Sequence, residues 1–387
     1  MSSFDVRDSL AVIHRPRVLG DIVGNQKNVD IISGFLKRRE LVKTWMFAGG
    51  SGSGKTTTAR LLAMILNCQN LGDGIDPCME CPSCRFALAN NHPDILELNA
   101  AGEEGKVESI RNILNQIKVA PRFNFKVVIV DEAHGLTGKA KEEVLKPLEE
   151  PPAKTVWILC TTEPEKLAGA TFGRCLKLYW DYPTVSEMAK RLLKISKSAY
   201  PDIYKDLKPH LKSIVSAAGN QPRNSISLME SVAAALIASN QNEEDVERII
   251  KNLVSSMGEL DGLVMKFVTY LLSKKRFVPM DTIRQLEQSR AQEFVTLVHR
   301  YSYYASLWYL YVLTNKIDKF DRKGLWGVNF MRFDAQLQKL RDKGVEDIDL
   351  QALKLCSAAT TCQEKMRLGL VTNEQALVFL INDYFKG

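Results

Sequence analysis

Several features are absent from this 387-residue sequence, and each absence excludes a class of protein. Residues 1–10 lack a positively charged start followed by an apolar run and a small-residue cleavage site, so no secretion signal is expected. The most apolar late stretch, residues 294–313, is interrupted by His299, Arg300 and several serines, which favours a buried helix over a membrane span. No internal repeat or low-complexity tract is found. The sequence therefore predicts a cytoplasmic globular protein that does not enter a membrane.

The composition is that of an ordinary globular chain, with 45% hydrophobic and 25% charged residues. Its length exceeds the size at which one hydrophobic core keeps growing, so two or three domains are expected. The net charge of +7 suits a polyanionic partner, although such an excess is also common among proteins that bind no nucleic acid. In a reducing compartment the eight cysteines are expected to be thiols or metal ligands.

The first half alternates apolar runs with amphipathic helical patterns, which is typical of an α/β fold with a parallel sheet covered by helices on both faces. The predicted strands are residues 45–48, 95–98, 127–130 and 156–160. Helical patterns dominate after residue 183, where Thr184 and Glu187 have the spacing of a capping box. A polar stretch, residues 240–245, then separates two helical regions. We predict three domains: 1–180 with the sheet, 181–240 small and helical, and 241–387 all-helical.

A phosphate-binding loop follows the first predicted strand and opens a helix, as G-x-x-x-x-G-K-[ST] requires. It reads Gly49-Gly50-Ser51-Gly52-Ser53-Gly54-Lys55-Thr56. Its backbone N–H groups and the helix N-terminus are expected to hold the phosphates of ATP. Lys55 would reach the β and γ phosphates and the Thr56 hydroxyl would bind Mg²⁺, with Thr57 also counted among the nucleotide-binding residues.

Two carboxylates, Asp131 and Glu132, end the apolar run at residues 127–130. Asp131 is predicted to hold the Mg²⁺, and Glu132 to orient and deprotonate the attacking water. An acidic pair after a strand is weak evidence alone. Together with the phosphate loop it indicates hydrolysis of the nucleotide.

A cysteine cluster spaced C-x9-C-x2-C-x2-C occupies residues 68–84 and consists of Cys68, Cys78, Cys81 and Cys84. Four thiolates suit a closed structural Zn²⁺ site without an open position for chemistry. A redox role for one of the two-residue-spaced pairs is the alternative, because thiol oxidoreductases share that spacing. The other four cysteines receive no assigned chemistry.

In these motifs the first 240 residues or so resemble the gamma/tau subunit of the bacterial DNA polymerase III clamp loader, a family of AAA+ ATPases. Beside the phosphate loop and the cysteine cluster, the resemblance is carried by His14-Arg15-Pro16, Asp21-Ile22-Val23-Gly24 and Leu148-Glu149-Glu150-Pro151-Pro152. It implies an AAA+ sheet domain with an inserted zinc module, a helical lid domain and a helical collar through which subunits assemble. After residue 240 only helical character and length remain similar.

The resemblance also implies roles for individual residues. Arg15, Pro16 and Val23 would line the adenine pocket, Thr162 would be a polar sensor, and Arg223 would reach the γ phosphate from the lid. Arg174 is similar to the arginine finger of a Ser-Arg-Cys motif that acts on the neighbouring subunit's nucleotide. An isolated arginine is otherwise read as a surface ion-pair residue.

This sequence departs from the family pattern at three positions. Gly173 replaces the serine before the finger, which puts the local support of Arg174 in question, and His14 replaces a tyrosine. Pro147 stands where a continuous helix would have a better helix former.

The function implied by the resemblance is loading of a sliding clamp onto primer-template DNA. ATP binding would assemble the loader, and hydrolysis would release the closed clamp. The implied partners are other loader subunits, copies of this chain among them, the clamp and DNA, in a bacterial cell or from a large bacteriophage. Lys106, Lys139 and Lys141 are candidates for phosphate contacts, with solvated surface lysines as the alternative.

Two other classes compete with this reading. A stator subunit of the same machine would bind no nucleotide, which the intact Lys55, Asp131 and Glu132 argue against. A motor helicase or remodelling AAA+ ATPase would lack both the cysteine cluster and the motif at residues 148–152.

Overall fold

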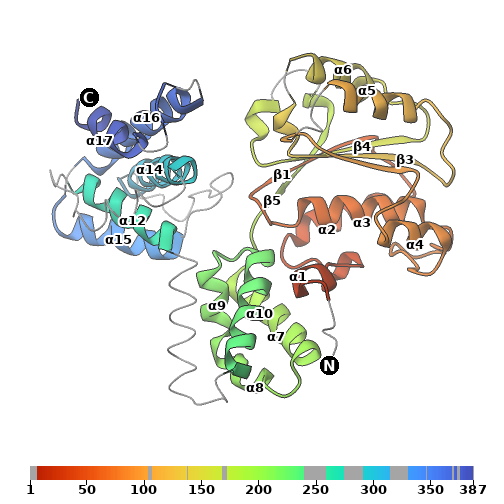
Figure 1. Ribbon diagram of the computed structural model, residues 1–387, viewed down its shortest axis with the longest axis horizontal. Coiled ribbons are helices and arrows are strands. Elements are labelled where there is room, and N and C mark those ends of the chain that lie inside the picture. The colour runs from red at the N-terminus through yellow and green to blue at the C-terminus, as the bar shows by residue number, and fades with distance from the viewer. Residues whose placement is uncertain are drawn as a thin grey trace, which may run out of the picture. The chain divides into compact units, whose positions relative to one another are not determined.

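The computed structural model describes residues 7–102, 107–136, 138–167, 172–238, 259–273, 291–313, 330–345, 347–367, 370–372 and 375–386 (Figure 1). The chain forms two compact units, Met1–Val215 with Asn220–Ala234, and Ser216–Gly219 with Ala235–Gly387. The first unit contains the sheet and the helices that follow it, and the second is helical. The division at residues 180/181 and 240/241 stays a prediction, and the second boundary lies outside the described residues.

A parallel sheet of five strands, in the order β2-β3-β4-β1-β5, forms the centre of the first unit. The strands are β1 (Thr44–Gly49), β2 (Ile95–Asn99), β3 (Lys126–Asp131), β4 (Thr155–Thr161) and β5 (Leu176–Trp180). Four of them contain the predicted apolar runs. The edge strand β5 was not predicted, because its buried positions alternate with exposed ones and Lys177 interrupts the apolar residues.

Helices cover both faces of the sheet, which explains why its central strands are apolar throughout. Along β1, Trp45 and Phe47 pack in one buried cluster with α2 (Gln26–Lys37) and α3 (Lys55–Asn67). Met46, between them, packs in a second cluster with α5 (Val107–Gln116) and α6 (Gly138–Glu149). Figure 1 shows these two helix pairs on opposite faces of the sheet. The predicted α/β fold class, a parallel sheet with helices on both faces, is confirmed.

The remaining helices of the first unit precede, connect or follow the strands of this helix-covered sheet. They are α1 (Leu10–Ile13), η1 (Leu19–Asp21), α4 (Pro82–Leu88), η3 (Ala133–Gly135), η4 (Pro164–Leu167), η5 (Phe172–Arg174), α7 (Val185–Ala199), α8 (Tyr204–Leu207), η6 (Lys208–His210), α9 (Leu211–Ala217) and α10 (Pro222–Ala238). The capping box predicted at Thr184 and Glu187 begins α7. Pro147 lies inside α6, so the departure noted in the sequence does not end that helix.

The second unit has a helical core of its own, in which aromatic rings pack among a larger number of aliphatic side chains. Its described helices are α12 (Glu259–Leu272), α14 (Ala291–Leu313), α15 (Phe330–Asp342), α16 (Ile348–Arg367) and α17 (Ala376–Lys386). Tyr301 meets Phe333 edge to face, with ring centroids 4.7 Å apart. The stretch at residues 294–313 lies within α14, which is a core helix as predicted. Among the described residues, no helix has the length and apolar character needed to cross a membrane.

Candidate nucleotide-binding site

The phosphate loop joins the end of β1 to α3 at the carboxyl edge of the sheet. Gly49 is required at the end of β1, because a Cβ there would collide with the backbone carbonyl and side chain of Trp180. The 13-residue helix α3 begins at Lys55, so its free N-terminal amides face the loop. A loop held in this way at a helix N-terminus is an anion-binding arrangement.

The side chain of Lys55 is folded into the loop and is only 5% exposed. Its Nζ donates to the carbonyl oxygens of Gly49 and Gly50, at 2.8 Å each. Burial lowers the pKa of Lys55, and the nearby carboxylates of Glu132 and Asp131 oppose that shift. The ammonium group is therefore oriented by two neutral acceptors, which phosphate oxygens could replace with stronger, charge-assisted bonds.

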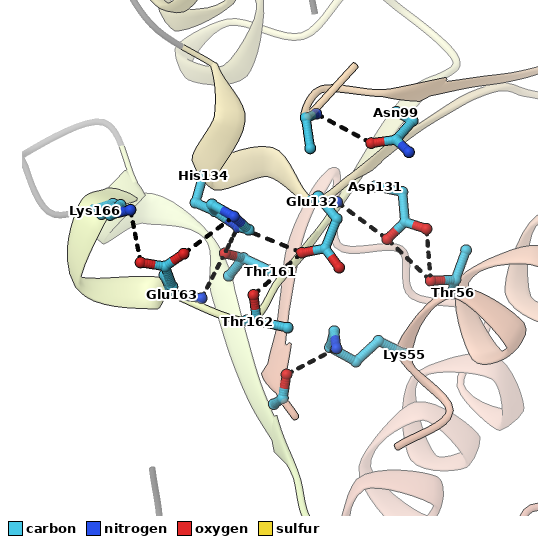
Figure 2. A network of polar contacts seen from close by, with 12 residues as sticks. Lys55, Thr56, Asn99, Asp131, Glu132, His134, Thr161, Thr162, Glu163 and Lys166 are labelled. Atoms are coloured by element: carbon cyan, nitrogen blue, oxygen red, sulfur yellow. Dashed lines mark hydrogen bonds and ion pairs between the residues drawn. The ribbon is translucent and has the colours of Figure 1, made fainter. Parts of the chain in front are cut away.

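The two predicted acidic residues lie beside the loop at the end of β3 (Figure 2). The Thr56 Oγ1 lies 3.0 Å from each carboxylate oxygen of Asp131. Glu132 accepts a hydrogen bond of 3.2 Å from the Thr162 hydroxyl at the end of β4. The fold thus brings together the Thr56 hydroxyl and the Asp131 carboxylate, whose oxygens suit Mg²⁺. The Glu132 carboxylate lies beside them and accepts a different hydrogen bond, from Thr162.

A pocket of about 840 Å³, partly open to solvent, extends from the phosphate loop to α7 and α10. Most of the predicted nucleotide-binding residues line it, namely Arg15, Pro16, Val23, Gly52, Ser53, Gly54, Lys55, Thr56, Thr57 and Arg223. Gly49, Gly50, Ser51 and Thr162 do not line it.

The pocket carries an excess of positive charge, since Arg15, Lys55, Arg191 and Arg223 all line it together with a single acidic residue, Asp21. Burial lowers the pKa of Arg15, and the neighbouring arginines, Arg223 among them, lower it further. Crowded, partly buried guanidinium groups favour a multiply charged anion such as a triphosphate.

Arg191 on α7 was missed by the sequence interpretation. Its side chain is 14% exposed, lies 3.3 Å from Asp21 and donates a hydrogen bond of 3.1 Å to the His14 carbonyl. A single arginine in an amphipathic helix has no sequence signal that separates it from a surface residue. Only the fold brings it to the segment that precedes α2.

The cysteine cluster converges at one end of α3 and the start of α4. The four sulfur atoms lie within 4.8 Å of one another, and Cys78 and Cys84 are 3.9 Å apart. Zn–S bonds of about 2.3 Å in a tetrahedron place sulfurs about 3.8 Å apart, so the spacing fits a Zn²⁺ ion. The N–H groups of Cys81 and Glu80 lower the pKa of Cys78 to about 6, whereas burial raises the pKa of Cys84. A bound cation would supply the charge that keeps buried thiolates ionised.

Comparison with known proteins identifies relatives for this chain. Residues 24–181 match the family described as "DNA polymerase III, delta subunit". The DNA polymerase III subunit tau/gamma of Haemophilus influenzae is 32% identical over 263 residues, which is 67% of this chain and 36% of that protein. Subunit gamma of Buchnera aphidicola is 35% identical over 221 residues, 56% of this chain and 59% of that protein. This chain is a relative of the DNA polymerase III gamma and tau subunits.

The chain spans between about a third and three fifths of the length of these relatives. Among solved structures, RuvB of Thermotoga maritima, a Holliday junction branch migration motor, aligns with 68% of this chain and 81% of its own, with a TM-score of 0.48 and 20% identity.

Two predicted features of a gamma/tau relative lie away from the pocket. Arg174 is at the end of η5, where its side chain is 62% exposed and lies 3.3 Å from Glu149 of α6. Of the candidate DNA contacts, Lys139 is exposed, and Lys141 donates to the Lys166 carbonyl at 3.1 Å. Lys106 lies outside the described residues.

Proposed function

We propose that this gamma/tau relative is an ATPase subunit of a sliding-clamp loader. The observation that carries the proposal is the meeting of Lys55, the Thr56–Asp131 pair and Glu132 at the carboxyl edge of one sheet. A stator that binds no nucleotide would need none of these groups. The cysteine cluster and the motif at residues 148–152 argue against a remodelling ATPase.

Each residue at the site has a proposed task. Lys55 binds the β and γ phosphates, Thr56 and Asp131 hold Mg²⁺, and Glu132 takes a proton from the attacking water. When bound, Mg²⁺ supplies charge neutralisation for the phosphate oxygens. Arg15, Pro16 and Val23 enclose the adenine.

The two proposed sensors and the proposed arginine finger make nucleotide binding depend on how neighbouring subunits assemble. Thr162 and Arg223 contact the γ phosphate from the end of β4 and from α10, and Arg174 contacts the nucleotide of the neighbouring subunit. The position of Arg174 outside its own pocket, with an exposed side chain, supports action in trans.

The proposed partners are other loader subunits, copies of this chain among them, a ring-shaped clamp and primer-template DNA. The loader must act at any DNA sequence, so DNA is held through its phosphates. Of the two described lysines, Lys139 is the better candidate for a phosphate contact because its side chain is exposed. Lys141 already bonds to a carbonyl group. The proposed place of action is the cytoplasm of a bacterial cell.

The cysteine cluster is proposed as a structural Zn²⁺ site with Cys68, Cys78, Cys81 and Cys84 as ligands. Convergence of all four sulfurs supports this over the redox alternative, which needs only one pair.

ATP hydrolysis by the co-purified assembly, measured with clamp alone, primed DNA alone and both together, tests the proposal. A loader is stimulated most by both together. A stator shows no hydrolysis of its own, and a remodelling ATPase shows no dependence on the clamp.

A further inference from the structure

His134, in the short helix η3, connects two carboxylates at the edge of the site (Figure 2). Its Nδ1 is 3.4 Å from Oε2 of Glu132, and its Nε2 is 3.2 Å from Oε1 of Glu163. The Thr161 hydroxyl lies 3.3 Å from the same Nδ1. A ring with hydrogen on both nitrogens donates to both carboxylates, whereas a neutral ring donates to only one.

The residue that His134 contacts is held in an uncommon conformation. Glu132 has φ of 47°, in the left-handed region, which is costly for a side chain of this kind. Its N–H donates to Asp131 Oδ1 at 3.1 Å, so its backbone and carboxylate are both oriented. Such strain persists where surrounding contacts determine the geometry, and it is concentrated at functional sites.

The backbone that carries the ring is closely packed, because η3 approaches the turn after β2. A Cβ on Gly135 would lie 2.5 Å from the Ala100 carbonyl oxygen, so only glycine permits this approach. The Ala100 N–H in turn donates to the Asp131 carbonyl at 2.8 Å. His134 is therefore mounted on a rigid support beside β3, as a positioning group requires.

The contacts continue from His134 to the segment that follows β4. Glu163 lies 2.7 Å from the Lys166 Nζ, in η4, and its N–H donates to the Thr161 hydroxyl at 3.0 Å. These bonds orient Glu163 and so orient the far side of the imidazole ring.

We propose that His134 is a positioning residue for the catalytic base Glu132, an inference that rests on the proposed ATPase function. In this structure the Glu132 carboxylate is held by Thr162 and His134. Once Thr162 turns its hydroxyl to a γ phosphate, His134 is the remaining described side chain that holds this carboxylate. It keeps the oxygen directed at the attacking water, and Glu163 keeps the ring in place.

Two variants separate the two sides of the ring. In His134→Asn the amide nitrogen can occupy the position of Nδ1, facing Glu132, and in His134→Gln it reaches the position of Nε2, facing Glu163. We expect His134→Ala to lower kcat for ATP hydrolysis about 10- to 100-fold, a part of the 10² to 10⁴ that a positioned base contributes. KM for ATP should stay within about twofold, because the lost contact acts on the base and not on the nucleotide. His134→Asn should recover most of kcat, and His134→Gln little.

The measurement uses the full chain in its co-purified assembly, with thermal unfolding of each variant as the folding control. Equal turnover by the Asn and Gln variants, or unchanged kcat in His134→Ala, overturns the positioning role. If His134→Ala fails to fold, the comparison of the Asn and Gln variants still decides. Glu132→Gln in the same assay distinguishes failure of the proposed base from failure of the proposed positioning residue. Normal hydrolysis by Glu132→Gln refutes Glu132 as the base. Loss of hydrolysis in Glu132→Gln together with normal turnover by His134→Ala refutes only the role of His134.

Discussion

Arg174→Ala is the most informative substitution, because it should change the stability of the chain little and the rate of ATP hydrolysis a great deal. In its own chain Arg174 makes an exposed ion pair with Glu149, with side chains 62% and 36% exposed. Exposed pairs contribute about 0.2–1 kcal/mol, so the folded chain should lose less than about 1 kcal/mol of stability. An arginine finger contributes a factor of about 10³ to 10⁵ in rate, which is about 4 to 7 kcal/mol of transition-state stabilisation.

The matched control is Glu149→Gln, which breaks the same ion pair and leaves the guanidinium in place. We expect Arg174→Ala to bind ATP nearly normally and to lose clamp- and DNA-stimulated hydrolysis, while Glu149→Gln hydrolyses ATP at a near-normal rate. Steady-state ATPase assays and equilibrium nucleotide binding measure the two effects. If both variants lose activity equally, the ion pair rather than the finger is what matters.

Mixed assemblies test whether the finger acts in trans. Lys55→Ala chains still carry a finger, and Arg174→Ala chains still carry an intact pocket. Hydrolysis should return at boundaries where an intact finger faces an intact pocket. No recovery at any mixing ratio, with assembly confirmed by mass, would refute action across the boundary.

Three further predictions follow from the same structure. Lys55→Ala should weaken ATP binding, whereas Glu132→Gln should bind ATP and hydrolyse it slowly; normal turnover by the latter would exclude Glu132 as the base. Metal analysis of chain purified without chelator should find one Zn²⁺, and Cys84→Ser should lose it together with a lowered Tm; metal-free wild-type chain would reject the site. Asp94 is buried and lies 2.8 Å from the Lys126 Nζ, so Asp94→Asn should cost about 3 kcal/mol in urea unfolding at pH 7.

The pH dependence of the Asp94 contribution has a definite sign. Burial would raise the pKa of Asp94, but Lys126 and the N–H groups of Phe123 and Arg122 outweigh burial and lower it. A depressed pKa means that the stabilisation is present above the unfolded value of about 3.9 and is lost as pH falls through the folded value. Urea unfolding near pH 3 should therefore show a smaller difference between wild type and Asp94→Asn than at pH 7, and an unchanged difference would contradict this account.

Local sequence motifs were enough to predict most of the candidate site residues and most of the strands. The phosphate loop, the Asp131–Glu132 pair and the cysteine cluster each depend on residues close together in the chain, so spacing alone indicates their chemistry. Strands that are buried on both faces can also be predicted from the sequence, because the helices that cover them require apolar residues at every position. The edge strand β5 lacks that pattern and was missed.

Only the tertiary structure decided which distant side chains meet. Arg191 reaches Asp21, 170 residues earlier, because α7 packs beside the nucleotide pocket. His134 contacts Glu163 because η3 and η4 follow the neighbouring parallel strands β3 and β4, whose carboxyl ends meet at one edge. Neither pair has a spacing that sequence could indicate, since the first contact is set by the packing of α7 and the second by the order of the strands in the sheet.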